Sequence, residues 1–331
     1  MKTIQPGHGS GGKLMNELIN SVIRSRFGSE NIQLDDSAIL DISSEKVAFT
    51  TDTYTISPLF FPGGNIGTLA VNGTVNDLAV MGARPMYLSC GLILEQGFPI
   101  SDLEKVLDSM RSEADAAGVR IVTGDTKVVE RGKADGIFIN TCGIGTLKNP
   151  VRSDITPGDR IIISGTIGDH GMAIMAMRNR LTFSGDLRSD CAHLNHLIGH
   201  ALERCPDGIK FMRDPTRGGV ASVLNEITSG NDFSARLYEE HLPVRDEVRG
   251  VCGILGLDPL YSANEGKVVF IVSEGESENL LRALRENEKG KDACIIGEID
   301  TAFPGGAYIE TAVGGRRIIP LLAEEQLPRI C

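Results

Sequence analysis

Short apolar runs alternate with longer stretches of helical periodicity along most of this sequence. Val47–Thr51 is a predicted strand, whereas Gly67–Met81 and Ser101–Ala117 are predicted helices. Ser101 is placed to cap the second helix, and Gly118 follows directly after its last residue. The alternation predicts a mixed fold of the α/β or α+β type.

Two turns near the middle of the chain divide it into halves. Residues 149–150 and 156–159 carry the Asn, Pro, Gly and Asp residues that are typical of turns. At 331 residues the chain is long enough for two domains with separate cores. The last eleven residues contain Pro328 and would reach roughly 35 Å if fully extended. The predicted units are an N-terminal domain over 1–150, a C-terminal domain over 151–320 and a flexible tail over 321–331.

The overall charge and hydropathy exclude several classes of protein. The formal net charge is −11, and no run of five Lys or Arg residues occurs. Nucleic acids and anionic membrane surfaces attract proteins with a surplus of Lys and Arg. No stretch approaches 18 consecutive apolar residues, and the first six residues lack the apolar part of a signal peptide. The composition predicts a cytoplasmic protein that binds neither nucleic acid nor membrane.

The seven cysteines are scattered and form no CxxC pair. In a reducing compartment this pattern indicates buried thiols, because unpaired cysteine behaves as a small core residue. Cys331 differs from the other six because it is the last residue of the sequence, where side chains pack least. We therefore expect chemistry at Cys331.

Single acidic residues occur in several separate elements, as a magnesium–phosphate site requires. Magnesium prefers oxygen ligands and takes one or two carboxylates together with phosphate oxygens. Asp77 lies within the apolar helix 67–81, where a charge needs a partner or a metal. Each acid alone is also compatible with a cap or turn residue. The acids of this group are Asp35, Asp36, Asp52, Asp77, Asp125, which follows the predicted strand 119–123, and Asp214, which opens a segment containing Thr216, Arg217 and two glycines.

Two glycine-rich segments resemble nucleotide loops only in part. Gly7–Lys13 nearly matches the P-loop pattern, but Leu14 stands where Ser or Thr should bind magnesium. Its amides and Lys13 could still surround a phosphate, or the segment could be a mobile N-terminus. Gly165–Gly171 has the spacing GxxGxxG rather than the GxGxxG of dinucleotide-binding loops.

A group of histidines and cysteines has the residue types of a zinc site but not its spacing. Three of the histidines recur at i, i+3 and i+7, which is typical of partly buried positions on an amphipathic helix. The group contains Cys191, His193, His196, His200 and Cys205.

Lys127 and Glu265 are candidates for proton transfer. Lys127 stands two residues after Asp125, and Glu265 precedes the predicted strand 267–273. A Lys and a Glu that face one substrate can orient it and move its proton. Both residues are also compatible with ordinary surface charges.

Taken in order, these segments resemble the HypE family of hydrogenase-maturation proteins, within the PurM-like, AIR synthetase-related superfamily. The resemblance covers essentially the whole chain, and the ending PRIC is highly specific. Selenophosphate synthetases instead carry cysteine or selenocysteine near the N-terminal glycines, where this chain has His8 and Ser10. Thiamine-phosphate kinases and AIR synthetases lack a tail with a terminal thiol. The matching segments are HGSGGK at 8–13, LDDSAIL at 34–40, FTTDTYTISPLFFPGGNIGTLAVNGTVNDLAVMGARP at 49–85, IVTGDTKVV at 121–129, SGTIGDHG at 164–171, RDPTRGGVA at 213–221, ANEGK at 263–267 and PRIC at 328–331.

The resemblance implies a fold and an activity. The N-terminal domain would dimerise through its sheet and hold ATP and magnesium, and the C-terminal domain would cover the site. HypF carbamoyltransferase would load a carbamoyl group onto the terminal cysteine, and ATP-dependent dehydration would convert that group to a thiocyanate. The cyanide would pass to iron on a HypC–HypD complex, for NiFe hydrogenase. A phosphotransferase acting on a free small molecule and a non-catalytic scaffold are the alternatives.

The resemblance also implies roles for individual residues. Cys331 would carry the carbamoyl group, Glu265 would act as general base and Lys127 as its electrostatic partner. The tail would lie inward for dehydration and outward for loading and delivery. The implied magnesium ligands are Asp36, Asp52, Asp77 and Asp125, and the implied nucleotide and phosphate contacts are Lys13, Asn76, Asp214, Thr216 and Arg217.

Overall fold

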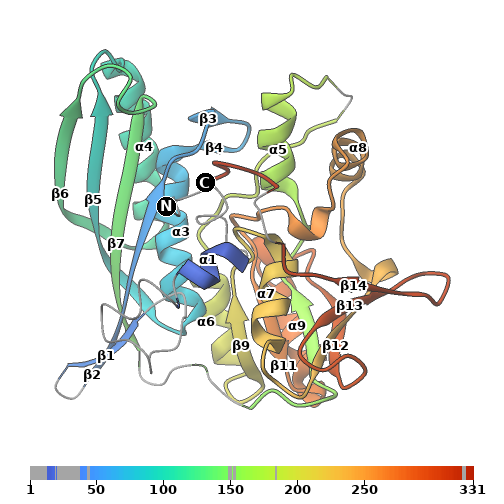
Figure 1. The fold of residues 1–331 in the computed structure, drawn as a ribbon. Coiled ribbons are helices and arrows are strands. Elements are labelled where there is room, and N and C mark those ends of the chain that lie inside the picture. Colours follow the sequence, from blue (N-terminus) through green and yellow to red (C-terminus); the bar gives the residue numbers. More distant parts are fainter. Residues whose placement is uncertain are drawn as a thin grey trace.

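The protein is built on two β-sheets, whose strands come from residues 38–147 and 160–319 in the computed structural model (Figure 1). Asp36 and the glycine-rich segment before Lys13 lie outside the described residues. The mixed α/β class is confirmed. The structure describes residues 13–18, 20, 38–42, 45–147, 151, 154–182, 185–322 and 326–331.

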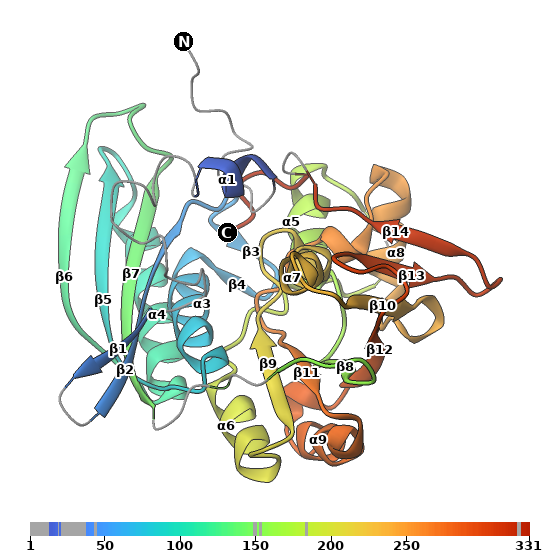
Figure 2. The same ribbon diagram turned by 60° about the horizontal axis from the view of Figure 1, so that its bottom comes forward.

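The N-terminal sheet has five strands in the order β1-β2-β7-β5-β6. Only β5 and β6 run parallel to each other, and the other neighbours are antiparallel. Helices α3 and α4 lie on one face, which we call the inner face; no helix of the described chain covers the opposite, outer face (Figures 1 and 2). The elements are β1 (Ala38–Ile42), β2 (Glu45–Tyr54), α3 (Ile66–Val80), β5 (Arg84–Glu95), α4 (Ile100–Ala117), β6 (Arg120–Val129) and β7 (Ile137–Leu147), with a short helix α1 (Lys13–Leu18) and a small hairpin of β3 (Phe60–Phe61) and β4 (Gly64–Asn65).

Helix α3 is apolar on all sides because it is buried on all sides. Fourteen of its fifteen residues are buried, and only Asp77 is half-buried. Asn65 caps its start by accepting hydrogen bonds from the backbone amides of Gly67 and Thr68. Gly67 lets α4 approach closely, since a Cβ there would lie 2.4 Å from the carbonyl oxygen of Val106. An all-apolar helix at the centre of the molecule is the expected result.

The predicted helices of this half are confirmed to within a residue, but three local predictions were wrong. Ser101 does not cap α4, because the helix already begins at Ile100 and Pro99 holds the capping position without a side-chain bond. Asp52 and Asp125 lie inside β2 and β6 rather than after them. Both strands continue through polar residues because β2 has one face open to solvent and β6, an edge strand, is exposed on both faces.

The C-terminal sheet has seven strands in the order β14-β13-β10-β12-β8-β11-β9. Its two apolar cores lie on opposite faces, one beneath α7 and one beneath α6 and α9. The second core also contains Ala79 and Val80 of α3, so it joins the two halves of the molecule. The elements are β8 (Arg160–Ile163), α5 (Asp169–Arg178), α6 (Asn195–Arg204), β9 (Ile209–Arg213), α7 (Gly219–Thr228), β10 (Ser234–Tyr238), α8 (Asp246–Leu255), β11 (Val269–Val272), α9 (Ser277–Arg285), β12 (Cys294–Asp300), β13 (Ala307–Glu310) and β14 (Arg316–Ile319).

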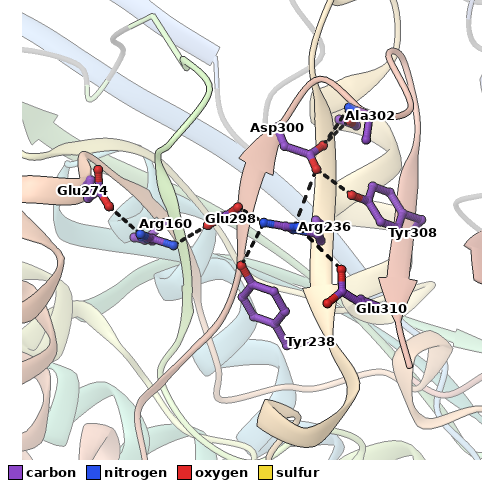
Figure 3. Close-up of polar contacts among 10 residues, drawn as sticks. Arg160, Arg236, Tyr238, Glu274, Glu298, Asp300, Ala302, Tyr308 and Glu310 are labelled. Carbon is purple, nitrogen blue, oxygen red and sulfur yellow. Dashed lines mark hydrogen bonds and ion pairs between the residues drawn. The ribbon is translucent and has the colours of Figure 1, made fainter. Parts of the chain in front are cut away.

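A network of ion pairs crosses one face of this sheet (Figure 3). Arg236 on β10 lies between Asp300, at 3.7 Å, and Glu310, at 3.5 Å, and it also pairs with Glu298. Arg160 connects Glu298 to Glu274 on the other side. Opposite charges on neighbouring strands stabilise their pairing. None of the predicted site residues belongs to this network, so we assign it a structural role.

A third core cluster joins both halves of the chain to residues 326–331. Tyr54 and Ile56 from the N-terminal half pack in one cluster with Met172 from α5. Leu327 and Ile330 belong to the same cluster and are 5% and 2% exposed. The described end of the chain is therefore docked between the halves (Figure 1). No helix in the described ranges is both long and apolar enough to cross a membrane.

Candidate active site

The inner face of β2 carries a row of polar side chains that meets α3. Strand alternation directs Thr50, Asp52 and Tyr54 to this face, whereas their neighbours Thr51 and Thr53 are exposed. The hydroxyl of Tyr54 donates to Asp52 Oδ2 at 2.9 Å. The hydroxyl of Thr50 donates to Oδ2 of the α3 residue Asp77 at 2.7 Å, which gives that charge in the apolar helix a partner.

Tyr54 marks the centre of a negatively charged site. Its pKa is raised well above 10, first by burial and then by the charges of Asp52, Asp77 and Glu265. Carboxyl groups from β2, α3 and the C-terminal half therefore all act electrostatically on one phenol, and that of Asp52 bonds to it. The structure brings these three predicted residues together.

Glu265 is the most unusual group of the site. Its side chain is only 3% exposed, and its Oε1 atom has no hydrogen-bond partner among the described residues. Burial raises the pKa of Glu265 well above its ordinary value, and the charges of nearby acids raise it further. The charge of Arg217 acts in the opposite direction. Glu265 therefore stays in its neutral, protonated form at pH values where an ordinary glutamate begins to ionise. The acids that raise this pKa are Asp214, Asp190 and Asp52.

Residues 190–192 hold the backbone of Glu265 in place. Asp190 Oδ1 accepts from the amide of Glu265 at 3.2 Å, and the amide of Ala192 donates to the carbonyl of Glu265 at 3.2 Å. Lys267 forms a 3.0 Å ion pair with Asp190, which is almost fully buried. Burial acts to raise the pKa of Asp190, but the charges of Lys267 and His170 and the hydrogen bonds from Glu265 and Lys267 together outweigh it, and the pKa is lowered. The general-base candidate therefore lies against a fixed negative charge.

The loop between β9 and α7 carries Asp214, Thr216 and Arg217, and the amide of Asn264, next to Glu265, donates to the carbonyl of Pro215 in this loop at 3.0 Å. Asp214 is 6% exposed, Thr216 is half-buried and Arg217 is exposed. Gly219 has a φ of +59°, and a Cβ there would lie 2.5 Å from the carbonyl oxygen of Leu260, so only glycine fits this turn. The charges of Asp214 and Arg217 both act on the pKa of Glu265, which shows that the loop borders that residue.

Asp125 and Lys127 lie on the outer face of the sheet. Asp125 pairs with Gly91 on β5, which pairs with Asn140 on β7. Asn140 in turn pairs with the exposed outer-face residue Thr53 of β2, and directly paired residues share a face. Lys127, two residues after Asp125, points to the same side and forms a 3.0 Å ion pair with it. Within one chain these two residues do not meet the inner-face carboxylates.

Asn76 and Lys13 bond to residues outside the group of acids around Tyr54. The Asn76 side chain donates to the carbonyl of Ala192 at 3.0 Å and accepts from the amide of Leu194 at 2.7 Å, so α3 is bonded to the second half of the chain. Lys13 is exposed, lies 3.9 Å from Glu17, and its amide donates to the carbonyl of Leu322. In this structure Asn76 has a packing role.

The histidines of the zinc-like group bind different partners. His193 lies 3.3 Å from Glu113, and His200 lies 2.8 Å from Glu286. His196 bonds to the carbonyl of Ala116 at 3.1 Å. Two of these partners, Glu113 and Ala116, lie on α4, and Glu286 directly follows α9. Within the described residues no group of three or more His, Cys, Asp or Glu side chains is arranged to hold a metal ion.

Cys331 lies just past the end of β2, the strand whose inner face carries Asp52 and Tyr54. Its carbonyl accepts a 3.1 Å hydrogen bond from the amide of Thr55, the residue after Tyr54. The residue is half-buried and packs against the core cluster that contains Tyr54. The docked tail therefore delivers this cysteine to the side of the site where Asp52 and Tyr54 are bonded.

Sequence reasoning missed Tyr54 and Asp190. Tyr54 could have been found, because it follows Asp52 by two residues and so shares its face of the strand. Asp190 lies in an irregular segment with no motif, and only the fold brings it to Glu265.

The residues present fit a magnesium–ATP complex. Asp52 and Asp77 supply two carboxylates near one phenol, and magnesium needs one or two carboxylates with phosphate oxygens completing its shell. Arg217 and the glycines beside it supply positive charge and an open backbone for phosphate. Glu265 supplies a buried group whose pKa is shifted towards neutrality, as general acid–base chemistry requires.

Comparison with known proteins identifies the family of the chain. Residues 34–147 match the AIR synthase related protein N-terminal domain, and residues 156–308 match the corresponding C-terminal domain. The chain is 47% identical over 340 residues to the carbamoyl dehydratase HypE of Escherichia coli, with 100% of both chains covered.

Two solved structures are similar over almost their whole length. A crystal structure of HypE in complex with ATP has a TM-score of 0.83 and 46% identity, covering 99% of this chain and 100% of that one. A crystal structure of a HypE–HypF complex has a TM-score of 0.86 and 46% identity, covering 92% and 99%. The chain therefore belongs to the HypE family of AIR synthase related proteins.

Proposed function

We propose that this protein dehydrates a carbamoyl group carried on the sulfur of Cys331 to a thiocyanate, with consumption of ATP. The proposal is supported by the names of the close relatives and by the position of Cys331 beside the carboxylate cluster. The product would supply cyanide ligands to the iron of NiFe hydrogenase. The observation that carries the proposal is the buried Glu265 carboxyl group, one oxygen of which has no partner in the described structure.

The reaction requires a good leaving group on the carbamoyl carbon and the removal of two protons from its nitrogen. The amide oxygen of the carbamoyl group attacks the γ-phosphorus of ATP, ADP leaves, and the nitrogen loses its first proton. The carbon–oxygen bond then breaks, phosphate departs with the former amide oxygen, and the nitrogen loses its second proton as the nitrile forms. Phosphorylation converts a poor leaving group into a good one, and catalysis is mainly positioning and charge stabilisation.

Glu265 is the group suited to accept a proton from nitrogen. It must be ionised to do so, and cations near the carboxyl group lower its raised pKa. Arg217 already acts in this direction. A carboxyl group with a pKa near the working pH is an efficient acid–base catalyst.

We assign ATP and magnesium to the inner face of the sheet. Asp52 and Asp77 would hold magnesium, with Asp36 as a further ligand from outside the described residues. When bound, magnesium neutralises charge on the phosphates. Asp214, Thr216 and Arg217 would contact the nucleotide, and Lys13 would reach phosphate from the N-terminal segment. Asn76 we assign to domain packing, on the basis of its two backbone bonds.

We assign Lys127 and Asp125 to the site of a second copy of the chain. Both lie on the outer face, which no helix of the described chain covers and which carries the exposed apolar side chains Phe49 (44%) and Ile93 (43%). Pairing of two such faces would form a homodimer, as closed two-fold symmetry favours. We propose that the interface also extends past an edge of the partner's sheet to its inner face, so that Lys127 of one chain faces Glu265 of the other and orients the amide.

A mixed-dimer experiment tests this assignment. Lys127→Ala and Glu265→Gln chains are each expected to be inactive. Mixing them under exchange conditions should restore about a quarter of the wild-type rate, because half of the dimers are mixed and one of their two sites has both residues. Recovery of no activity would place Lys127 and Glu265 in the same chain or outside catalysis.

The reaction is tested by following the mass of the protein. After incubation with HypF, carbamoyl phosphate and ATP, wild-type protein should gain one carbamoyl group and then lose one water. Glu265→Gln should bind ATP and accept the carbamoyl group but lose no water. A variant that lacks Cys331 should show neither change, whereas a phosphotransferase acting on a free small molecule would retain its activity.

The remaining partners follow from the same reaction. We propose that HypF carbamoyltransferase loads Cys331 and that a HypC–HypD complex receives the cyanide, in the cytoplasm. Loading and delivery require the tail to leave its docked position. Limited proteolysis should therefore cleave residues 321–331 at different rates with and without ATP.

A further inference from the structure

The last residues of the chain lie along the segment after β2 as an added strand would. The amide of Thr55 donates to the carbonyl of Cys331 at 3.1 Å, and the amide of Ser57 donates to the carbonyl of Arg329 at 3.4 Å. Two residues forward on one segment correspond to two residues backward on the other, which is the antiparallel pattern. Backbone bonds of this kind fix the register of an added segment.

Arg178, the last residue of α5, bonds to this pair of segments from the side. Its Nε donates to the carbonyl of Ser57 at 2.6 Å, and one terminal nitrogen donates to the carbonyl of Pro328 at 2.5 Å. The other terminal nitrogen donates to the carbonyl of Arg329. A guanidinium group is planar and rigid, so these three bonds fix the spacing between the docked tail and residue 57.

His170 holds the next carbonyl of the tail. Its ring is fully buried, and Nε2 lies 2.8 Å from the carbonyl oxygen of Ile330. A carbonyl only accepts, so Nε2 carries the proton and Nδ1 accepts from the hydroxyl of Ser189 at 2.8 Å. The same Ser189 oxygen accepts from the amide of Cys191 at 3.1 Å.

The segment Ser189–Ala192 connects this contact to the general base. Ser189 meets His170, while Asp190 and Ala192 bond to the backbone of Glu265. One short segment therefore holds the tail contact at one end and the Glu265 backbone at the other. The segment Ser189–Ala192 therefore fixes the position of the docked tail relative to Glu265.

We propose that Arg178 and His170 are positioning residues that set where the Cys331 sulfur lies relative to Glu265. This inference rests on the proposed dehydration. Both residues bond to main-chain carbonyls of residues 328–330, which are the same groups whatever the cysteine sulfur carries. These bonds therefore hold the thiol, thiocarbamate and thiocyanate forms of the tail alike.

The test compares Arg178→Gln with wild type, with Arg178→Lys and with Arg188→Gln. Arg188 is a matched control because it is an exposed arginine bonded to Asp186. The first readout is the rate at which iodoacetamide alkylates Cys331, measured on the tail peptide by mass spectrometry. Arg178→Gln should raise this rate about tenfold or more, since several charge-assisted bonds are lost. Arg178→Lys should lie between, and Arg188→Gln should match wild type.

The second readout is the rate of water loss from the loaded protein in a single turnover. It should fall about tenfold or more in Arg178→Gln, with ATP affinity and carbamoyl loading unchanged. Equal alkylation rates in all four proteins would overturn the holding role. Faster alkylation with an unchanged dehydration rate would overturn the positioning role. If wild type itself fails to lose water, the proposed function falls, and the alkylation rates still decide whether Arg178 holds the tail.

Discussion

The hydroxyl group of Tyr54 donates a 2.9 Å hydrogen bond to Asp52, two residues earlier on the same face of β2. Burial and the surrounding negative charges raise the pKa of Tyr54, so the phenol stays protonated and remains a donor throughout the working pH range. The bond therefore fixes one carboxylate of the proposed magnesium site while leaving its charge intact.

Replacing Tyr54 by Phe should weaken the binding of magnesium–ATP. Asp52 loses the donor that orients it, and one hydrogen bond of this kind corresponds to about three- to tenfold in affinity. Calorimetric titration with ATP in the presence of magnesium measures the change. Tyr308→Phe is the control, because Tyr308 donates a similar bond to Asp300 on the distant sheet. Equal affinities for the two variants would contradict the role of Tyr54.

Gly73 of α3 packs against the same Tyr54 side chain. A Cβ at this position would lie 2.2 Å from the Tyr54 hydroxyl oxygen, in a region where α3 has no room to move. Gly73→Ala should therefore destabilise the protein by about 1–3 kcal/mol, as overpacking of a core does. Gly199 of α6 has open space around its added Cβ, so Gly199→Ala should be neutral or stabilising by up to about 1 kcal/mol. Denaturant unfolding of both variants measures the difference.

Glu265 should make the stability of the protein depend on pH. Its pKa in the folded state is raised, so folding takes up a proton at any pH between the ordinary value of 4.5 and the raised one. The free energy of unfolding of wild type therefore falls as the pH rises through this window. The Glu265→Gln variant lacks this carboxyl group. Its free energy of unfolding relative to that of wild type should therefore be about 1 kcal/mol or more higher at pH 8 than at pH 5.

The control for this comparison is Glu288→Gln. Glu288 is an exposed residue that pairs with Lys291 on the surface. Its pH profile of unfolding should run parallel to that of wild type. Parallel profiles for Glu265→Gln as well would show that Glu265 is not held neutral in the folded protein.

Protonation of His170 should release the tail. Burial lowers the pKa of His170 below its ordinary 6.5 in the docked state, although the bond to Ile330 and the charge of Asp190 oppose this, and the charge of Arg178 adds to it. The docked state thus binds fewer protons than the released state and is favoured above pH 6.5. As the pH falls below this value, docking weakens.

The measurement is the alkylation rate of Cys331 divided by that of a free peptide ending in the same four residues, at each pH. The ratio should rise as the pH falls from about 7.5 to about 5.5, a range centred on the ordinary pKa of histidine. In His170→Gln the ratio should not change with pH. A flat ratio in wild type would exclude His170 as the group that responds.

The sequence predicted the central layer of the molecule well. Helix 67–81 appears as α3 (Ile66–Val80), because a helix with small and apolar residues on every side is stable when it is buried between two packed layers. The helix over 101–117 ends at Gly118 with a φ of +72°, as its position in the sequence indicated. Local pattern and tertiary packing agree in these elements.

The arrangement of the site could not be derived to the same extent. Asp125 looked like a residue at the end of a strand, but β6 continues for four more residues, and strand alternation then turns its side chain to the outer face. Asn76 stands beside Asp77 in the sequence yet points to the second half of the chain, because successive residues of a helix face different directions. These placements depend on register and packing, which a single sequence does not contain.

The contacts of Arg178 and His170 with main-chain oxygens determine how much the tail sequence is free to vary. Every residue type offers a carbonyl group, so these bonds do not depend on the side chains at positions 328 and 329. Arg329 adds side-chain contacts of its own, a partly exposed ion pair with Asp135 and a 2.9 Å hydrogen bond from Nε to the carbonyl of Thr55. The core instead restricts Leu327 and Ile330, whose side chains are 5% and 2% exposed. An aliphatic group of similar size should therefore be retained at both positions, because a larger or charged one would hold the cysteine outside.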